Sequence, residues 1–290
     1  MIFDEKIKLN NGNEIPKLAL GTWLIDDAIV ADAVVNAIEI GYRHIDTAQA
    51  YENERGVGEG IRKSAVPREK LFVTSKIQAE IKDYVAAKKS IDDTLNLMGL
   101  DYLDLMIIHS PQPWAEYNKS ENRYYKENKE VWKALQEAYE AGKVKNIGIS
   151  NFKEQDIQNI LEDCKIKPVI NQILCHISNT PLEVIAYCQK NDIQVEAYSP
   201  IAHGKSLDNP VIKEIAQKYN VSVPQLCIRY DWQLNTIVLP KTANKEHMKQ
   251  NADINFEISA EDMETLKHLN KIKDYGELNK FAVYGHNDMK

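Results

Sequence analysis

The sequence contains no run of 18 or more apolar residues, no block of like charges and no low-complexity tract. A membrane-spanning helix and a disordered charged tail are therefore not expected. Lys and Arg number 36 against 43 Asp and Glu, so the net charge is −7. This balance disfavours a nucleic-acid-binding surface, which needs clustered basic residues. The first residues also lack the basic stretch and apolar run of a secretory signal.

Cysteine is scarce, with four residues and no CxxC pair: Cys164, Cys175, Cys188 and Cys227. This usage predicts reduced thiols in a cytoplasmic protein and no zinc site. Cys175 and His176 are adjacent, which leaves a metal role open. Neighbouring residues on a strand point to opposite faces, however, so this alternative is disfavoured.

Short β-rich runs alternate with longer segments of helical spacing along the whole chain. Eight strands are expected near Leu18–Gly21, His44–Asp46, Phe72–Lys76, Leu103–His109, Ile147–Ser150, Val169–Gln172, Gln194–Tyr198 and Thr236–Leu239. An uninterrupted series of this kind predicts a parallel sheet with crossover helices, and eight strands can close a (β/α)8 TIM barrel. No linker divides the series, so one domain is predicted over residues 1–290.

Two further features accompany the predicted barrel. "IKLNNGNEI" places an Asn-Gly pair between alternating residues, which predicts an N-terminal hairpin that caps one end of the barrel. The strand-to-strand spacing is unusually long from 103 to 147, where the aromatic-rich stretch "SPQPWAEYNKSENRYY" follows a strand. Active sites of such barrels lie on the loops that leave the strands' carboxyl ends, so this stretch is expected to border the substrate.

The segment "GYRHIDTAQAYENERGVGEGI" (41–61) contains three alternating glycines, Gly56, Gly58 and Gly60. A dinucleotide fingerprint needs GxGxxG directly after a strand, whereas this spacing is GxGxG and a charged stretch separates it from the strand. The Rossmann interpretation is therefore weak. Close packing of a helix against the barrel explains the glycines better.

Polar residues end three consecutive predicted strands: Asp46 in "HIDT", Lys76 in "LFVTSK" and His109 in "MIIH". Tyr51 lies in the loop just after Asp46. A lysine beside an aspartate avoids an unpaired buried charge, and a lysine beside a tyrosine lowers the phenol pKa. Each residue alone would usually be structural, but the four together form an acid-catalysis device in which Tyr51 is the general acid.

The chain resembles the aldo-keto reductase family over nearly its full length. The matching stretches are "GYRHIDTAQAYENERGVGEGI", "LFVTSK", "LDLMIIHSP", "GKVKNIGISNF", "NQ" (171–172), "AYSP" (197–200) and "LPKT" (239–242). The resemblance implies a catalytic tetrad of Asp46, Tyr51, Lys76 and His109. It further implies reduction of aldehydes and ketones by a nicotinamide cofactor, with a C-terminal tail near the active site and no metal.

The same resemblance implies the cofactor-binding residues. Ser150, Asn151 and Gln172 match contacts to the nicotinamide carboxamide, and Tyr198 matches the aromatic that stacks on the ring. The remaining matches are Ser199, Pro200 and Ile201 near the pyrophosphate, Lys241 and Thr242 at the adenosine 2′-phosphate, and the associated positions His247 and Asn251. Trp23 matches a tryptophan of the substrate pocket, although a core aromatic is the alternative.

Two departures from the family pattern affect the expectations. His247 stands where an arginine commonly meets the 2′-phosphate, and a neutral imidazole cannot replace a bidentate guanidinium. NADPH is therefore predicted to remain preferred through Lys241, but weakly, and NADH use is compatible. Ser110 replaces a common tryptophan and is expected to change the pocket, which Trp114 and other loop aromatics could refill.

Two other functions compete with the reductase interpretation. A nicotinamide-binding regulatory or interaction protein with slow turnover is the alternative, and a metal-dependent hydrolase is disfavoured because no histidine-carboxylate cluster has ligand spacing. The expected partner is a small carbonyl substrate; aldehydes, ketoacids, keto esters, sugars and diketones all fit. No nucleic acid or membrane partner is expected, and the resemblance implies a monomer.

Overall fold

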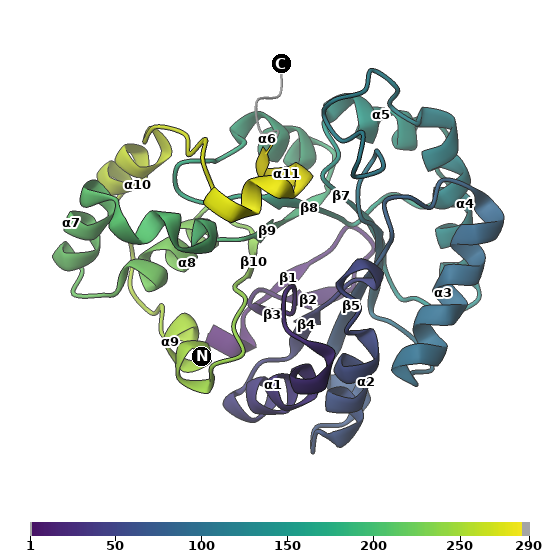
Figure 1. The fold of residues 1–290 in the computed structure, drawn as a ribbon, viewed down its shortest axis with the longest axis horizontal. Helices are drawn as coiled ribbons and strands as arrows, with labels where there is room; N and C mark the ends of the chain where they lie inside the picture. Colours follow the sequence, from purple (N-terminus) through teal and green to yellow (C-terminus); the bar gives the residue numbers. More distant parts are fainter. Residues whose placement is uncertain (1, 286–290) are drawn as a thin grey trace.

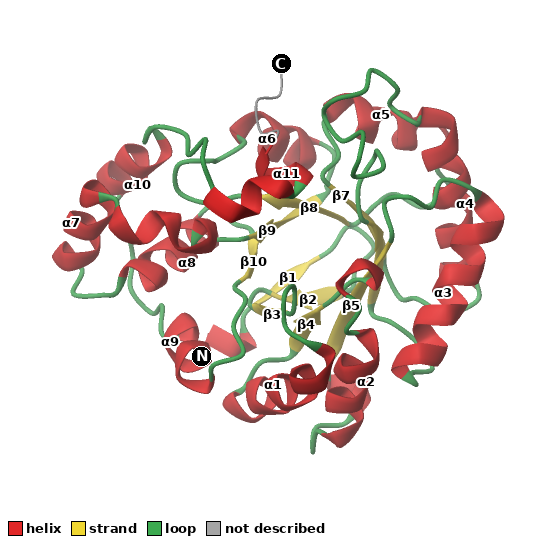
Figure 2. Cartoon of the chain, in the orientation of Figure 1, coloured by secondary structure: helices red, strands yellow, loops and turns green. Residues whose placement is uncertain are grey.

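The structure is a computed structural model that describes residues 2–285. Eight parallel strands form an inner ring, and helices surround it (Figures 1 and 2). The strands are β3 (Ala19–Gly21), β4 (His44–Asp46), β5 (Phe72–Ile77), β6 (Leu105–Ile108), β7 (Ile147–Ser150), β8 (Ile170–Leu174), β9 (Gln194–Tyr198) and β10 (Ile237–Leu239). Three of the predicted strands have these bounds, and each end of the other five lies within two residues of them.

The sheet runs in sequence order from β3 to β10 and closes on itself. Two bridges join its first and last strands, Leu18 with Val238 and Gly21 with Lys241. The amide of Gly21 donates to the carbonyl of Pro240 at 3.0 Å. The predicted (β/α)8 barrel is thereby confirmed.

Helices follow the strands as predicted. They are α1 (Asp27–Ile40), α2 (Glu54–Lys63), α3 (Tyr84–Met98), α4 (Tyr125–Glu140), α5 (Glu154–Asp163), α6 (Leu182–Lys190), α7 (Pro210–Lys218), α8 (Val223–Gln233), α9 (Lys245–Ala252), α10 (Ala260–Lys267) and α11 (Ala282–Gly285). Five short 3-10 segments join them, namely η1 (Ile2–Asp4), η2 (Gln49–Tyr51), η3 (Arg68–Lys70), η4 (Ala202–Asp208) and η5 (Gly276–Lys280).

The N-terminal hairpin consists of β1 (Lys6–Lys8) and β2 (Glu14–Pro16) and covers the amino end of the barrel. Asn10 Nδ2 donates to the carbonyls of Pro168 (2.9 Å) and Asp192 (3.0 Å), which precede β8 and β9. The apolar side chain of Ile15 packs with Ile170 of β8 at this end. The hairpin therefore seals the end of the barrel that lies opposite the expected site.

Helix α2 carries the three glycines, which face its neighbouring helices rather than the strands. A Cβ at Gly56 would lie 2.5 Å from the carbonyl oxygen of Asp27, and one at Gly60 would lie 2.7 Å from that of Ala31, both on α1. A Cβ at Gly58 would overlap the backbone of Met98 at the end of α3. Close packing is confirmed, but the expected partner, the barrel, is wrong.

The barrel interior changes from apolar to polar along its axis. The layer next to the hairpin contains Leu105, Ile107, Ile170 and Ile237. Period-two alternation along the strands then brings His44, Thr74 and Glu196 to the middle, and all three are fully buried. Asp46, Lys76 and Tyr198 follow them at the carboxyl end, which is where barrels of this kind carry their active sites.

Candidate active site

The carboxyl end of the barrel brings the four predicted catalytic residues together. Asp46 ends β4, Tyr51 ends η2, Lys76 lies in β5 and His109 follows β6. Lys76 Nζ donates to Asp46 Oδ1 at 2.6 Å, to the carbonyl of Thr47 at 2.8 Å and to Tyr51 Oη at 3.3 Å. The imidazole of His109 faces the Tyr51 ring, with 5.6 Å between centroids.

The Lys76 ammonium is fully buried and keeps its charge. Burial alone lowers the pKa of Lys76, but the neighbouring Asp46 and Tyr51 outweigh it, and the net pKa is raised. Lys76 is therefore a fixed cation at the centre of the site.

Tyr51 differs from the expectation of a lowered pKa. Burial raises the pKa of Tyr51, the Lys76 ammonium acts against this rise, and the net direction is upward. Lys76 therefore acts in the predicted direction, but desolvation of the phenol is the larger effect. The result is a phenol that holds its proton at neutral pH and has a cation ready to stabilise the phenolate.

His109 is a neutral hydrogen-bond donor. Burial, followed by the nearby Lys76 cation, lowers the pKa of His109 well below its usual value. Its Nδ1 atom is buried and has no hydrogen-bond partner among the described residues. A buried N–H without an acceptor is costly, so the favoured tautomer carries its hydrogen on Nε2. That hydrogen is available to a carbonyl oxygen near Tyr51.

Four of the predicted nicotinamide-binding residues form one hydrogen-bonded group beside this site. Ser150 Oγ donates to the carbonyl of Gln172 at 2.8 Å. Asn151 Nδ2 donates to the carbonyl of His109 at 3.0 Å, and Tyr198 Oη donates to Asn151 Oδ1 at 2.7 Å. Gln172 Nε2 points into the barrel, whereas the structure shows no protein donor to Gln172 Oε1 among the described residues. Gln172 therefore offers a free amide oxygen to a ligand.

The predicted pyrophosphate residues Ser199, Pro200 and Ile201 lie directly after β9. Ser199 has a positive φ of 57°, and its Oγ bonds Tyr284 Oη of α11 at 2.6 Å. The His203 imidazole of η4 also bonds both hydroxyls, with 3.0 Å to Ser199 Oγ and 2.6 Å to Tyr284 Oη. The C-terminal tail thus lies against this loop, near the active site, as predicted (Figure 1).

The predicted 2′-phosphate residues lie at and after the end of β10. Lys241 pairs with Gly21 across the closing bridge, and its ammonium forms no ion pair with a described residue. Thr242 Oγ1 accepts from the Asn244 amide at 3.0 Å. His247 is exposed in the first turn of α9, whereas Asn251, one turn later on the same helix, is buried.

Aromatic residues line the side of the site where the substrate is expected. Ser110 is fully buried, and Trp114 packs edge-on against His109 with 5.1 Å between ring centroids. Trp114 therefore fills space beside the His109 imidazole, as the Ser110 replacement suggested. Tyr117 packs on Trp114 in turn. Trp23 contacts the tail through Phe281, at 4.9 Å between centroids, so it is a rim residue shared with the C-terminal segment.

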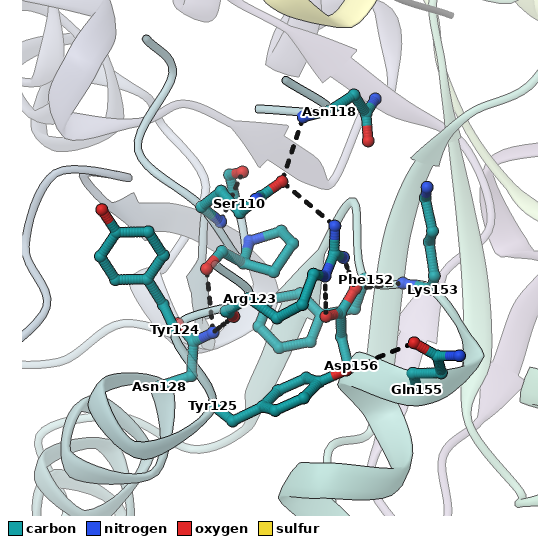
Figure 3. A network of polar contacts seen from close by, with 12 residues as sticks. Ser110, Asn118, Arg123, Tyr124, Tyr125, Asn128, Phe152, Lys153, Gln155 and Asp156 are labelled. Atoms are coloured by element: carbon teal, nitrogen blue, oxygen red, sulfur yellow. Dashed lines mark hydrogen bonds and ion pairs between the residues drawn. The ribbon is translucent and has the colours of Figure 1, made fainter. Parts of the chain in front are cut away.

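Polar contacts hold the long loop after β6 in place, as Figure 3 shows. Gln112 Oε1 accepts from the Asn118 amide at 3.0 Å and from Arg123 Nη1 at 3.2 Å. Arg123 forms a two-pronged ion pair with Asp156 of α5, with 3.0 Å from Nε to Oδ1. Asn128 Nδ2 donates to the carbonyl of Pro111 at 2.9 Å. The loop is a fixed wall tied to α4 and α5.

Two buried residues of the site were missed in the sequence. Asn53 accepts from Thr47 Oγ1 at 2.8 Å and donates to the carbonyls of Thr22 and Ile25, so it joins the loops after β3 and β4. Glu196 accepts from Gln172 Nε2 at 2.8 Å. The signal for Glu196 was present, because it lies two residues before Tyr198 and therefore on the same face of its strand.

The described residues include no group of three or more His, Cys, Asp or Glu that could hold a metal ion. Within the same residues, no helix combines the length and the apolar character needed to cross a membrane.

The chain is similar in sequence to a protein-family model and to individual proteins of known name. Residues 17–271 match the family model described as the aldo/keto reductase family. A glyoxal reductase of Bacillus subtilis is 40% identical over 274 residues, which cover 94% of this chain and 95% of the relative. A methylglyoxal reductase, DkgA, of Escherichia coli is 33% identical over 273 residues, which cover 93% of this chain and 95% of the relative.

Solved structures agree with the sequence relatives. An aldo-keto reductase of Bombyx mori in complex with NADP has a TM-score of 0.84 at 34% identity, and the match covers 95% of this chain and 96% of that chain. An aldo/keto reductase from Brucella melitensis has a TM-score of 0.85 at 37% identity, with 92% and 99% of the two chains covered.

Proposed function

Because the chain belongs to the aldo/keto reductase family, we propose that it reduces small aldehydes and ketones to alcohols with NADPH, and that Tyr51 is the proton donor. The observation that carries the residue assignment is the Lys76 ammonium, which lies 2.6 Å from Asp46 and 3.3 Å from Tyr51 in a fully buried setting. A second supporting observation is the neutral His109 imidazole, which faces the Tyr51 ring.

Each residue has its own role in the proposed reaction. When bound, the nicotinamide supplies hydride to the carbonyl carbon. Tyr51 gives its phenolic proton to the carbonyl oxygen, and Lys76 stabilises the phenolate that remains. Asp46 balances the Lys76 charge, so that the ammonium is never an unpaired ion in the barrel. His109 Nε2–H donates a hydrogen bond to the same oxygen and thereby orients the carbonyl.

The residues present fit a nicotinamide dinucleotide. Gln172 Oε1 has no described protein donor and can accept from a carboxamide N–H, while Tyr198 offers an aromatic face beside it. Lys241, with no carboxylate partner among the described residues, suits a phosphate. We propose Ser150, Asn151, Ser199, Pro200, Ile201, Thr242, His247 and Asn251 as the other cofactor contacts. NADPH is preferred through Lys241, and the preference is weak because His247 is not an arginine.

The substrate is proposed to be a small aldehyde or dicarbonyl compound. Two relatives are named as glyoxal and methylglyoxal reductases, which supports this class. Trp114 beside His109 adds an aromatic wall that suits a compact carbonyl substrate. Ser110 and Trp23 complete the proposed pocket.

A regulatory nicotinamide-binding protein with slow turnover is not favoured. Such a role does not call for an ammonium beside a phenol at the end of a barrel. We also propose that the enzyme is a monomer in a reducing, cytoplasmic setting. The four cysteines are free thiols, which supports the reducing setting. Sedimentation at micromolar concentration tests the monomer directly.

The experiment that tests the function follows NADPH oxidation with methylglyoxal and with an aromatic aldehyde. Wild type should turn over, and Tyr51→Phe should lower kcat by about 100-fold or more because the general acid is lost. Nicotinamide fluorescence should show that Tyr51→Phe still binds NADPH. Tyr125→Phe is the matched control, since its phenol bonds only the exposed Gln155 in the described structure. Equal rates for wild type and Tyr51→Phe would refute the assignment.

A further inference from the structure

A fully buried carboxyl group lies below the catalytic residues and takes no part in the proposed chemistry. Glu196 of β9 is 0% exposed. Its Oε2 accepts a hydrogen bond from Gln172 Nε2 at 2.8 Å, and its Oε1 has no hydrogen-bond partner among the described residues. Burying a carboxyl with only half of its hydrogen-bonding capacity used is unfavourable. An apolar side chain would fill this position at lower cost, as Ile170 and Ile237 do on neighbouring strands.

The hydrogen bonds of Gln172 indicate what Glu196 contributes. Gln172 Nε2 donates to Asp46 Oδ2 and to Glu196 Oε2, each at 2.8 Å. An amide nitrogen carries two hydrogens, so both are used. Asp46 also accepts a hydrogen bond from the Lys76 ammonium, at 2.6 Å. A flipped Gln172 amide would place its oxygen against Asp46 Oδ2 and remove the donor of Glu196 Oε2, so the observed orientation is favoured.

None of the described groups around Glu196 donates a hydrogen bond to its Oε1 atom. His44 Nε2 of β4 is 3.9 Å from Glu196 Oε1 and bonds Thr74 Oγ1 at 3.0 Å. Burial lowers the pKa of His44 to about 3, so the imidazole is neutral. Burial, and then Asp46, raises the pKa of Glu196 to about 8, while Lys76 acts in the opposite direction. At neutral pH Glu196 is an uncharged acceptor for Gln172, and no second cation is needed.

We propose that Glu196 is a positioning residue for the cofactor. Together with Asp46 it holds both amide hydrogens of Gln172, and this directs Gln172 Oε1 toward the carboxamide nitrogen of the nicotinamide. The inference rests on the proposed function, because it assumes that a nicotinamide occupies this end of the barrel. Asp46 alone would leave the second amide hydrogen unpaired and the amide less firmly oriented.

The competing explanation is that Glu196 only contributes to folding. The two explanations predict opposite behaviour for Glu196→Leu. A positioning role predicts weaker cofactor binding with unchanged or higher thermal stability, because a buried carboxyl is replaced by an apolar group of similar volume. A folding role predicts lower stability and no specific effect on the cofactor.

The test measures the Kd of NADPH by fluorescence for wild type, Glu196→Leu, Glu196→Gln, Gln172→Ala and the Glu196→Leu/Gln172→Ala double variant. Glu196→Leu should weaken binding about tenfold in the wild-type background and less than about twofold when Gln172 is already absent. Glu196→Gln keeps an acceptor for Gln172 and should stay within about threefold of wild type. Asp231→Val is the matched control. Asp231 is equally buried, and among the described residues its carboxyl accepts a side-chain hydrogen bond only from Cys175 Sγ, so the Kd should not change.

Three results would overturn the inference: an unchanged Kd in Glu196→Leu, the same loss in both backgrounds, or no recovery in Glu196→Gln. These results leave wild-type binding intact and are therefore distinct from failure of the proposed function. That failure would appear as wild type binding neither NADPH nor NADH.

Discussion

Among single residues, Lys76 sets Tyr51 apart from the other buried tyrosines of the site. Tyr198 and Tyr284 are desolvated as well, and burial raises the pKa of each. Among the described residues, neither has an ammonium within hydrogen-bonding distance, whereas Tyr51 has Lys76 at 3.3 Å. Desolvation keeps the proton on all three phenols. Of these three described tyrosines, only Tyr51 has a neighbouring cation that favours its release when charge develops on the substrate.

We expect position 247 to set how strongly the site distinguishes NADPH from NADH. Of the basic residues in this region, Lys245 already pairs with Glu39 at 2.8 Å and Lys249 with Glu246 at 2.7 Å. Lys241 has no ion-pair partner among the described residues and is therefore proposed to meet the 2′-phosphate. His247→Arg adds a permanent charge with bidentate geometry, so the KM for NADPH should fall about tenfold while the KM for NADH stays unchanged.

Lys245→Arg is the control for that experiment, because it keeps the charge of an exposed residue that is already paired. It should leave both Michaelis constants unchanged. An equal fall for NADPH and NADH in His247→Arg would show that position 247 does not face the 2′-phosphate. In wild type, equal Michaelis constants for the two cofactors would contradict the predicted NADPH preference.

That the four proposed catalytic residues lie together could be predicted from the sequence, because their positions follow from one rule. The carboxyl ends of parallel strands meet at one rim, so Asp46, Lys76 and His109 had to converge. The net pKa of Tyr51 could not be predicted, since it depends on how completely several strands and loops exclude water from the phenol. The link from Asp46 to Gln172 was also inaccessible, because 126 residues separate the two.

Among the elements, α2 shows how a motif can have a packing role instead of a binding one. Its glycines let the helix approach α1 on one side and α3 on the other, and these contacts are to backbone atoms that cannot move aside. The sequence indicated that small residues were needed there. It did not indicate the partners, because Met98 is 40 positions away and periodicity says nothing about which helices are neighbours.

Gly58→Ala should destabilise the protein in spite of the better helix propensity of alanine. The propensity gain is about 1 kcal/mol, but the new methyl group would overlap the Met98 backbone. Overpacking of this kind costs about 1–3 kcal/mol, and a backbone contact places the effect at the upper end. Urea unfolding should therefore show a net loss of about 1–2 kcal/mol.

Gly142→Ala provides the comparison for Gly58→Ala. A Cβ at Gly142 meets no atom within 4 Å, and only its positive φ of 74° opposes an alanine. Its loss should be about 1 kcal/mol, from backbone strain alone. If Gly58→Ala is as stable as wild type, α2 and α3 must be able to separate, and the close-packing explanation fails.

In the whole molecule, burial surrounds titratable groups whose protonation is tied to folding. Burial lowers the pKa of His44 to about 3 and that of His176, beneath Tyr275 after β8, to about 4, so both imidazoles are neutral in the folded protein. Burial raises the pKa of Glu196 to about 8, so this carboxyl is protonated. The sequence showed an ordinary acidic composition and no sign of this pattern, because only the folded molecule desolvates these groups.

These groups predict how stability depends on pH. Below pH 6.5 the unfolded chain protonates His44 and His176 while the folded protein does not, so each histidine removes stability as the pH falls toward 4. Each contributes about 1.4 kcal/mol per pH unit over that range. Glu196 acts in the opposite direction: between pH 4.5 and 8 the folded protein holds a proton that the unfolded chain has lost, so stability falls as the pH rises.

Two substitutions separate these contributions in urea unfolding from pH 4.5 to 8. Glu196→Gln removes the loss of stability that Glu196 causes as the pH rises. The unfolding free energy of this variant, relative to that of wild type, should therefore increase by about 1.4 kcal/mol per pH unit across the range. His176→Gln should remove one histidine's acid sensitivity below pH 6.5, whereas the exposed His268→Gln should leave the profile unchanged. Parallel profiles for wild type and Glu196→Gln would mean that Glu196 is ionised in the folded barrel. Lys76 would then have to balance two carboxylates, and Gln172 would be held between two anions instead of between an anion and a neutral acid.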